Sequence, residues 1–142
     1  MLLVADQLSK SWAVNELADG NTIDLVLGAR FNLHFNPGAA FSTGAALGPL
    51  FGVAAIIVSI WLLRFAHTQQ HRPVSFVSGL IIGGALGNVV DRLFRRGDDG
   101  FLRGFVVDFI DLGWWPVFNV ADMGIVVGVI SMMVLLVRNP DL

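Results

Sequence analysis

The sequence predicts an all-α polytopic membrane protein with a small extramembrane β element. Hydrophobic residues make up 55% of its 142 residues and charged residues only 14%, whereas a typical soluble domain is about 25% charged. The mean hydropathy is +0.71. Three complete transmembrane helices are predicted, at residues 49–65, 73–94 and 118–137. The length predicts one membrane-embedded domain over residues 1–142.

The composition also limits the chemistry. The formal net charge is −2 and the basic residues are scattered, so nucleic acid is not an expected partner. The chain has no cysteine, which excludes disulfides, thiolate metal sites and a cysteine nucleophile. Its histidines, His34, His67 and His71, do not form a metal-ligand pattern. We therefore expect neither a metal nor a cofactor.

The N-terminal residues predict the end of a truncated first helix. Met1 to Val4 are apolar, but four residues cannot span a bilayer, which needs about 20. The polar sequence Asp6 to Lys10 follows at once. This start is typical of the last turn of a helix, or of an interfacial segment, and it lacks the basic region of a cleavable signal peptide.

Residues 22–35 predict a small extramembrane hairpin. Apolar and polar residues roughly alternate there, as in half-buried strands, and Gly28 separates the two halves. Turn signals flank the segment at residues 20–21 and 36–38.

Three spans with short connections place residue 36 and the loop 95–118 at one membrane face, opposite residues 67–72 and the C-terminus. The unusual polar residues converge on that first face: Asp6, Asn36, Asn88, Asp91, Arg92, Asp108, Asn119 and Asp122. By the count of Lys and Arg near the span ends, this face would be cytoplasmic.

Asp108 and Asp122 lie inside otherwise apolar sequence. A carboxylate at the edge of hydrocarbon is costly to desolvate, so it indicates a functional site. Two such groups on one side of the membrane could share a proton and activate a water as a general acid/base pair. Simpler explanations stay open: Asp122 could cap a helix, and Asp108 could face water. Asp111 is a rival for the role of Asp108.

Asn88 follows Gly84 by one helical turn and so shares its face. An amide there needs partners and could hold a substrate carbonyl or a carboxylate. Gly79, Gly83 and Gly87 have the small-xxx-small spacing of closely packed membrane helices.

The remaining polar residues have ordinary explanations. Asp91-Arg92 could be an interfacial ion pair of little energetic weight, or Arg92 could bind a lipid phosphate or a substrate carbonyl. Asn36 and Asn119 are turn formers by default. Lys10 is most simply a snorkelling interface residue.

Together these residues form five motifs that resemble the bacterial lipoprotein signal peptidase family, signal peptidase II. In chain order the motifs are Asp6-Gln7-Leu8-Ser9-Lys10; Asn36-Pro37-Gly38-Ala39-Ala40-Phe41-Ser42; Gly84-Ala85-Leu86-Gly87-Asn88-Val89-Val90-Asp91-Arg92; Val106-Val107-Asp108-Phe109-Ile110; and Phe118-Asn119-Val120-Ala121-Asp122. They span nearly the whole chain, and five in this order are highly specific.

The resemblance implies a membrane aspartic endopeptidase that removes signal peptides from prolipoproteins by cutting before a diacylglyceryl-modified cysteine. It implies that Asp108 and Asp122 are the catalytic pair. The residues implied to line or orient the site are Asp6, Asn36, Gly84, Asn88, Arg92 and Asn119, with Lys10 and Asp91 as structural residues near it. The segment before Asn36 would form the family's small extramembrane sheet.

The resemblance also implies partners and a location. Lipid-modified prolipoproteins and membrane lipids are the expected partners, and the chain is expected to be a monomer. The expected location is the bacterial cytoplasmic (inner) membrane, with the active site facing the periplasm or cell exterior. This orientation is opposite to the one that the count of Lys and Arg gives, and we follow the resemblance.

One departure from the family leaves alternatives open. The family has four transmembrane helices, the first of which runs into the Asp-Gln-x-Ser/Thr-Lys motif, whereas only Met1 to Ala5 precede Asp6 here. Either the true start lies upstream of Met1, or the chain is a truncated form and could be an inactive homologue. It could also be a non-enzymatic transporter or channel subunit that uses the same carboxylates to bind ions or protons.

Overall fold

The computed structural model describes residues 1–38, 47–69 and 71–140. Its elements are α1 (Leu2–Glu16), the 3₁₀ turn η1 (Ala18–Gly20), β1 (Thr22–Asp24), the 3₁₀ turn η2 (Val26–Gly28), β2 (Arg30–Asn36), α2 (Gly48–Gln69), α3 (Arg72–Phe94), β3 (Val106–Asp111) and α4 (Val120–Arg138). Among the described residues, α2, α3 and α4 are long and apolar enough to cross a membrane. The predicted fold class, three spans with a small sheet, is confirmed.

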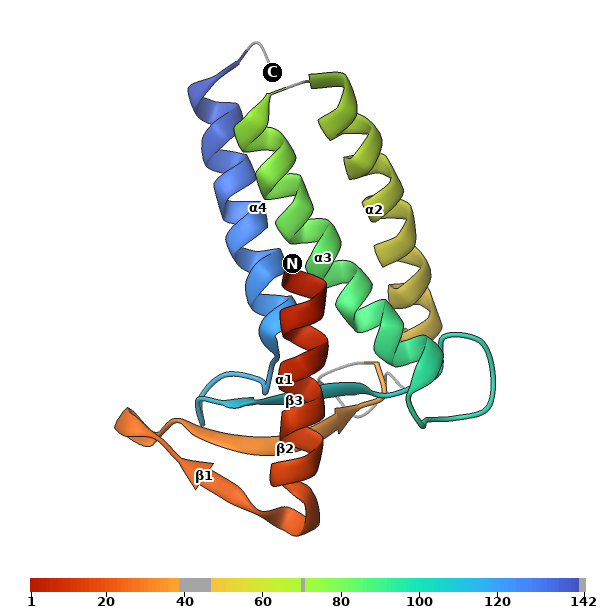
Figure 1. Cartoon of the computed structure of the whole chain (residues 1–142), viewed down its shortest axis with the longest axis vertical. Helices are drawn as coiled ribbons and strands as arrows, with labels where there is room; N and C mark the ends of the chain where they lie inside the picture. The colour runs from red at the N-terminus through yellow and green to blue at the C-terminus, as the bar shows by residue number, and fades with distance from the viewer. Residues whose placement is uncertain (39–46, 70, 141–142) are drawn as a thin grey trace.

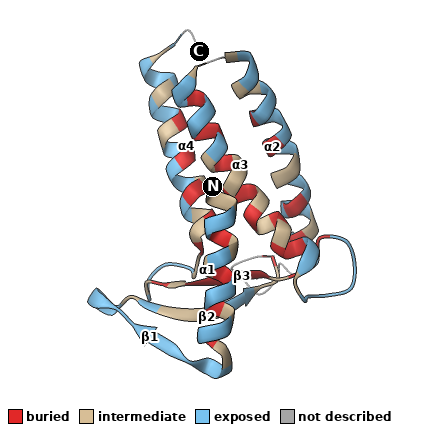
Figure 2. Ribbon diagram, in the orientation of Figure 1, coloured by how far each residue is buried: buried red, intermediate tan, exposed pale blue. Residues whose placement is uncertain are grey.

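The bundle is built around α3, which packs against both α2 and α4 (Figure 1). The shorter α1 packs on α3 and α4 at the end of the bundle that carries the sheet, and the C-terminus lies at the opposite end. Buried residues form stripes on the inner sides of the helices, and exposed residues cover their outer sides (Figure 2). Many exposed residues on α2 and α4 are large and apolar, such as Trp61 and Met133. Such surfaces are suited to lipid.

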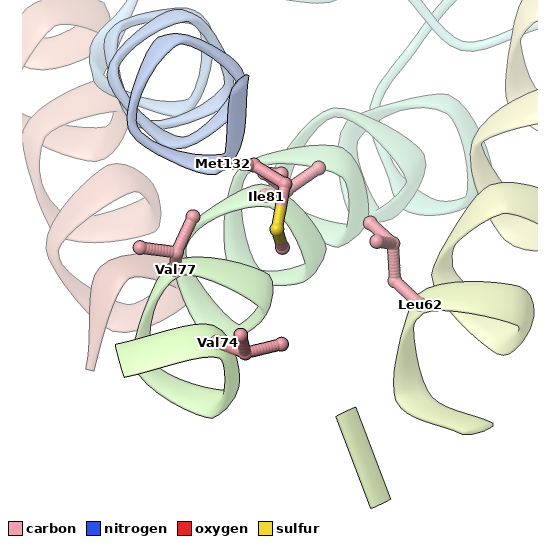
Figure 3. Close-up of a cluster of buried hydrophobic side chains, with 5 residues drawn as sticks. All are labelled: Leu62, Val74, Val77, Ile81 and Met132. Atoms are coloured by element: carbon pink, nitrogen blue, oxygen red, sulfur yellow. The ribbon is translucent and has the colours of Figure 1, made fainter. Parts of the chain in front are cut away.

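An apolar cluster holds the spans together away from the sheet. It consists of Leu62 from α2, Val74, Val77 and Ile81 from α3, and Met132 from α4 (Figure 3). The three α3 residues recur at positions i, i+3 and i+7, so they lie on one side of the helix. This cluster fixes how the three spans lie together without using a polar group.

The three strands form an antiparallel sheet in the order β1-β2-β3. β1 and β2 are the predicted hairpin, whereas β3 is absent from the sequence prediction. On one face of β3, Val107 and Phe109 pack with Ala13 of α1, so this face is apolar and buried. The alternation of a strand then places Asp108 on the other face.

The sequence suggested that Met1 to Val4 are the last turn of a helix or an interfacial start, and the first of these is wrong because α1 continues to Glu16. Asp6, Lys10 and Ala13 are the buried residues of this helix, and they recur at helical spacing. Two of these three buried residues are charged. The buried face therefore lacks the apolar residues at helical spacing from which a helix is predicted in a sequence.

Candidate active site

Three charged side chains with no solvent exposure form the base of a polar network at the sheet end of the bundle. Asp6 and Lys10 come from α1, and Asp91 comes from α3. Lys10 Nζ lies 2.9 Å from Asp6 Oδ2 and 2.9 Å from Asp91 Oδ2, and it donates to Asn88 Oδ1 at 2.8 Å. Each of the three ammonium protons therefore has an acceptor. The prediction that Lys10 snorkels to the interface is wrong.

The two buried carboxylates of this network also connect secondary structure elements. Asp6 Oδ1 accepts the backbone N–H of Ala121 at 2.9 Å, which ties α1 to α4. Asp91 Oδ2 accepts the backbone N–H of Val107 at 3.1 Å, which ties α3 to β3. Removal of either carboxylate would leave a buried N–H without its acceptor, which is costly.

Two members of the network were missed from the sequence. Gln7 Nε2 donates to Asp91 Oδ1 at 3.0 Å, and Arg95 Nε donates to the same oxygen at 2.7 Å. Asp91 therefore pairs with Lys10 and Arg95 rather than with Arg92. The i,i+4 spacing of Asp91 and Arg95 could have indicated this pair, because adjacent residues on a helix do not face each other.

Asn119 joins the two candidate catalytic acids. It is fully buried and caps α4, where its Oδ1 accepts the Asp122 backbone N–H at 3.0 Å and its own N–H donates to Asp122 Oδ2 at 3.2 Å. This reciprocal pair is a capping box. Its side-chain Nδ2 donates to Asp108 Oδ1 at 2.6 Å. The simpler explanation, in which Asp122 caps the helix, is wrong: Asn119 is the cap, and Asp122 is the third residue of α4.

Two further asparagines complete the hydrogen bonding of the acids. Asn88 Nδ2 donates to Asp122 Oδ1 at 2.8 Å, and Asn36 Nδ2 donates to Asp108 Oδ2 at 2.9 Å. Every oxygen of the two carboxyl groups therefore has one N–H donor and keeps a further lone pair. Residues 39–42 of the motif that begins at Asn36 lie outside the described residues.

Asp108 lies on β3 and is only 3% exposed, so its interpretation as a water-facing residue is wrong. The pKa of its carboxyl is raised from 3.8 to about 6. Burial is the main cause and the nearby Asp122 charge acts in the same direction, while the hydrogen bonds from Asn36 and Asn119 act against them. A carboxyl with this pKa can hold or release a proton close to neutral pH, as acid–base chemistry requires.

Asp111, the rival of Asp108, lies elsewhere. Three positions along a strand reverse the side-chain direction, and its Oδ2 accepts from Arg30 Nε at 2.8 Å. The hydrogen bond from Arg30, and then that from the Gly113 N–H, hold the pKa of Asp111 below its usual value. A carboxylate in this state is a structural ion pair rather than a proton carrier.

A largely apolar cavity of about 360 Å³ opens between α2, α3 and α4 beside the network. Asn88 and Arg92 are its polar lining side chains. Arg92 is 8% exposed, and its Nη1 lies 3.5 Å from the Pro37 carbonyl oxygen. Guanidinium has five donors, and with its partners among the described residues Arg92 makes just this long contact, so it can offer N–H groups to carbonyl oxygens in the cavity.

Gly84 determines how closely α3 and α4 approach. A Cβ at this position would collide with the Ala121 carbonyl oxygen and the Ile125 side chain. The structure therefore places Gly84 in the helix packing that brings Asn88 next to Asp122. Among the described residues, no group of three or more His, Cys, Asp or Glu side chains is arranged to hold a metal ion.

Of the residues named from the sequence, the hydrogen-bonded network connects Asp6, Lys10, Asn36, Asn88, Asp91, Asp108, Asn119 and Asp122. Arg92 and Gly84 lie next to it. The fold and this network define an integral membrane protein with a buried polar site where its helices meet a small sheet.

The family model for signal peptidase (SPase) II matches residues 1–138, so the chain belongs to the signal peptidase II family. A lipoprotein signal peptidase from Rhodococcus jostii is 43% identical over 137 residues, which are 95% of this chain and 68% of that protein. Another, from Syntrophomonas wolfei, is 37% identical over 141 residues, 98% of this chain and 89% of that protein.

Solved structures agree with this assignment. One, described as a bacterial membrane enzyme, has a TM-score of 0.81 and 28% identity and covers 97% of this chain and 88% of its own. A second with the same description has a TM-score of 0.80 and 27% identity and covers 99% of this chain and 85% of its own. The helices and sheet are therefore arranged as in known membrane enzymes.

Proposed function

We propose that this chain is a membrane aspartic endopeptidase that removes signal peptides from prolipoproteins by cutting before a diacylglyceryl-modified cysteine. Membership of the signal peptidase II family supports the substrate class and the peptidase activity. It also disfavours a transporter or channel subunit. The single observation that carries the aspartic mechanism is the link between Asp108 and Asp122 through Asn119.

In this mechanism a water molecule binds between the two acids. One carboxylate takes a proton from the water as the oxygen attacks the scissile carbonyl carbon, and the other, protonated, carboxyl donates to the carbonyl oxygen. The tetrahedral intermediate then collapses, the C–N bond breaks and the amine of the modified cysteine leaves with a proton. The pair holds one proton before and after each of these transfers.

The other residues position groups rather than transfer protons. Asn88, Asn119 and Asn36 hold the two acids through N–H donors. Arg92, with donors free for carbonyl oxygens beside the cavity, would hold the peptide or the lipid ester carbonyls. The network is assembled with Asp6 and Lys10 of α1 in place, which supports an active enzyme over an inactive homologue.

We also propose the setting of this reaction. The 142 residues act as one membrane-embedded unit and as a monomer in the bacterial inner membrane, with the sheet and the site toward the periplasm or cell exterior. The substrate enters sideways from the bilayer, so that its acyl chains remain in hydrocarbon while the cleavage point reaches the acids. Neither substrate entry nor cleavage by the two acids requires a metal or a cofactor.

The test is cleavage of a diacylglyceryl-modified prolipoprotein by the full chain in lipid vesicles, followed as a gel shift. We expect Asp108→Asn and Asp122→Asn each to abolish the shift while both variants still insert into the membrane. Asp111→Asn is the matched control, since this acid lies outside the network and should keep most of the activity. Substantial turnover by either of the first two variants would overturn the proposal.

A further inference from the structure

A second hollow is lined by Asp122, which does not line the cavity between α2, α3 and α4. It has a volume of about 420 Å³ and lies between the loop that joins β3 to α4 and the first turns of α4. We call it the loop groove. Its loop side is lined by Leu112, Trp114, Trp115 and Phe118, and its helix side by Asp122, Met123, Val126 and Val127.

The loop groove is chemically unlike the first cavity. Among the described residues that line it, Asp122 is the only ionisable one, and the two indole N–H groups are the only other side-chain N–H or O–H groups. The first cavity instead has the donors of Asn88 and Arg92. An extended peptide needs partners for its backbone groups, whereas an aliphatic chain needs none. The lining therefore favours an aliphatic occupant.

The loop groove is also continuous with the surface that α4 shows to lipid. Met123 is 49% exposed, Val126 56% and Val127 54%, and Met133 further along the helix is 61% exposed. At the other end, Trp114 and Trp115 meet edge to face with ring centroids 5.7 Å apart. Indole rings favour the level where hydrocarbon meets the polar interface. A chain in this groove could begin beside Asp122 and end in the bilayer.

We propose that the loop groove is an acyl-chain subsite, which holds one acyl chain of the diacylglyceryl group on the substrate cysteine. This inference rests on the proposed function. The first cavity then receives the peptide, and the cleavage point lies between the two hollows, at the acids. An acyl chain gains little by leaving lipid for an equally apolar groove. The groove therefore acts by placing the cysteine and by selecting chain length.

The test compares two synthetic prolipoprotein peptides that differ only in the acyl chains on the cysteine, palmitoyl or butyryl. Val126→Trp fills the groove in the full-length chain in vesicles. We expect it to lower kcat/KM for the palmitoyl peptide about tenfold more than for the butyryl peptide, since filling a fitted apolar pocket discriminates by that order. Met133→Trp is the matched control, because it lies two helical turns further on the same side of α4 and should leave both values unchanged.

An equal loss on both peptides, or no loss on either, would overturn the subsite. A second measurement does not depend on Val126→Trp folding. A palmitoyl peptide with a photoreactive terminal group is bound to the Asp108→Asn chain and irradiated. We expect cross-links at Met123, Val126 or Val127, and cross-links confined to α2 and α3 would contradict the inference. Failure of the wild-type chain to cut either peptide would instead count against the proposed function.

Discussion

Lys10 Nζ donates to Asn88 Oδ1 over 2.8 Å, and this contact determines which end of the Asn88 side chain faces Asp122. An ammonium group has only donors, so the atom it meets must be the amide oxygen. The Asn88 nitrogen is thereby turned toward Asp122 Oδ1, at 2.8 Å. Asn119 is fixed in the same way, since its oxygen accepts a backbone N–H. The amides are therefore oriented as donors to the acids.

The first prediction concerns Lys10. Lys10→Met should lower kcat at least about tenfold with little change in KM, because Asn88 Oδ1 loses its shorter donor and keeps the one from Asn119 Nδ2 at 3.1 Å. It should also destabilise the protein by about 3–5 kcal/mol, since Asp6 and Asp91 lose a buried cation. Both are measured on the purified chain, by steady-state kinetics and by thermal unfolding.

A double variant separates these two effects of Lys10. Lys10→Met with Asp6→Asn removes one charge of each sign, so stability should be largely recovered relative to the single variant. The kcat should stay low because Asn88 Oδ1 still lacks the ammonium donor of Lys10. Recovery of wild-type kcat in the double variant would show that Lys10 acts only on stability.

The second prediction separates the two roles of Asn119. Asn119→Ser keeps an oxygen that can cap α4 but removes the nitrogen that donates to Asp108, whereas Asn119→Ala removes both. Ala should cost about 1 kcal/mol more stability than Ser, as for other helix caps. Both variants should lose most of their kcat. Normal cleavage by Asn119→Ser would show that the contact with Asp108 is dispensable.

The third prediction is a pH dependence of stability that arises from Asp108. Its pKa is about 6 in the folded protein against 3.8 as the usual value, so the folded state holds the proton more tightly than the unfolded state does. The contribution of Asp108 to the free energy of unfolding therefore falls by about 3 kcal/mol as pH rises from about 4 to about 6. Below and above this range the contribution does not change with pH.

Thermal unfolding from pH 4 to pH 7 checks this prediction. Asp108→Asn cannot titrate, so the Tm of the wild type relative to this variant should decrease across the range. Asp111 has a pKa below its usual value, so its own contribution is lost on acidification instead and is common to both proteins. A difference in Tm that stays constant across this pH range would mean that the pKa of Asp108 is not raised in the folded protein.

The fourth prediction compares two glycines on α3. Gly84→Ala should destabilise the protein by about 1–3 kcal/mol, because the new methyl group would collide with the Ala121 carbonyl oxygen. Cleavage should fall as well, since α4 carries Asp122. Gly79→Ala meets nothing within 4 Å and should be neutral or slightly stabilising. Thermal unfolding and the gel shift check both, and equal behaviour of the two would contradict the packing role.

Apolar runs in the sequence were sufficient to predict the membrane class, the three spans and the side on which the polar residues gather. The hairpin was also predicted, because apolar and polar residues roughly alternate along residues 22–35. These signals are local: each depends only on the spacing of residues within one segment. β3 and the length of α1 were not predictable in this way. One face of β3 is buried by apolar residues, and the buried face of α1 is largely charged.

The sequence by itself determined which residue types are available to the site, and the motifs named nearly all of them. The motif resemblance favoured Asp108 over Asp111, and the tertiary structure adds a physical reason, because the two side chains leave opposite faces of β3. Only the tertiary structure decided that Lys10 is a buried network residue, since its acceptors come from α3 as well as α1. Contacts such as that of Asp6 with Ala121, which are 115 positions apart, arise from helix packing, and no local pattern encodes them.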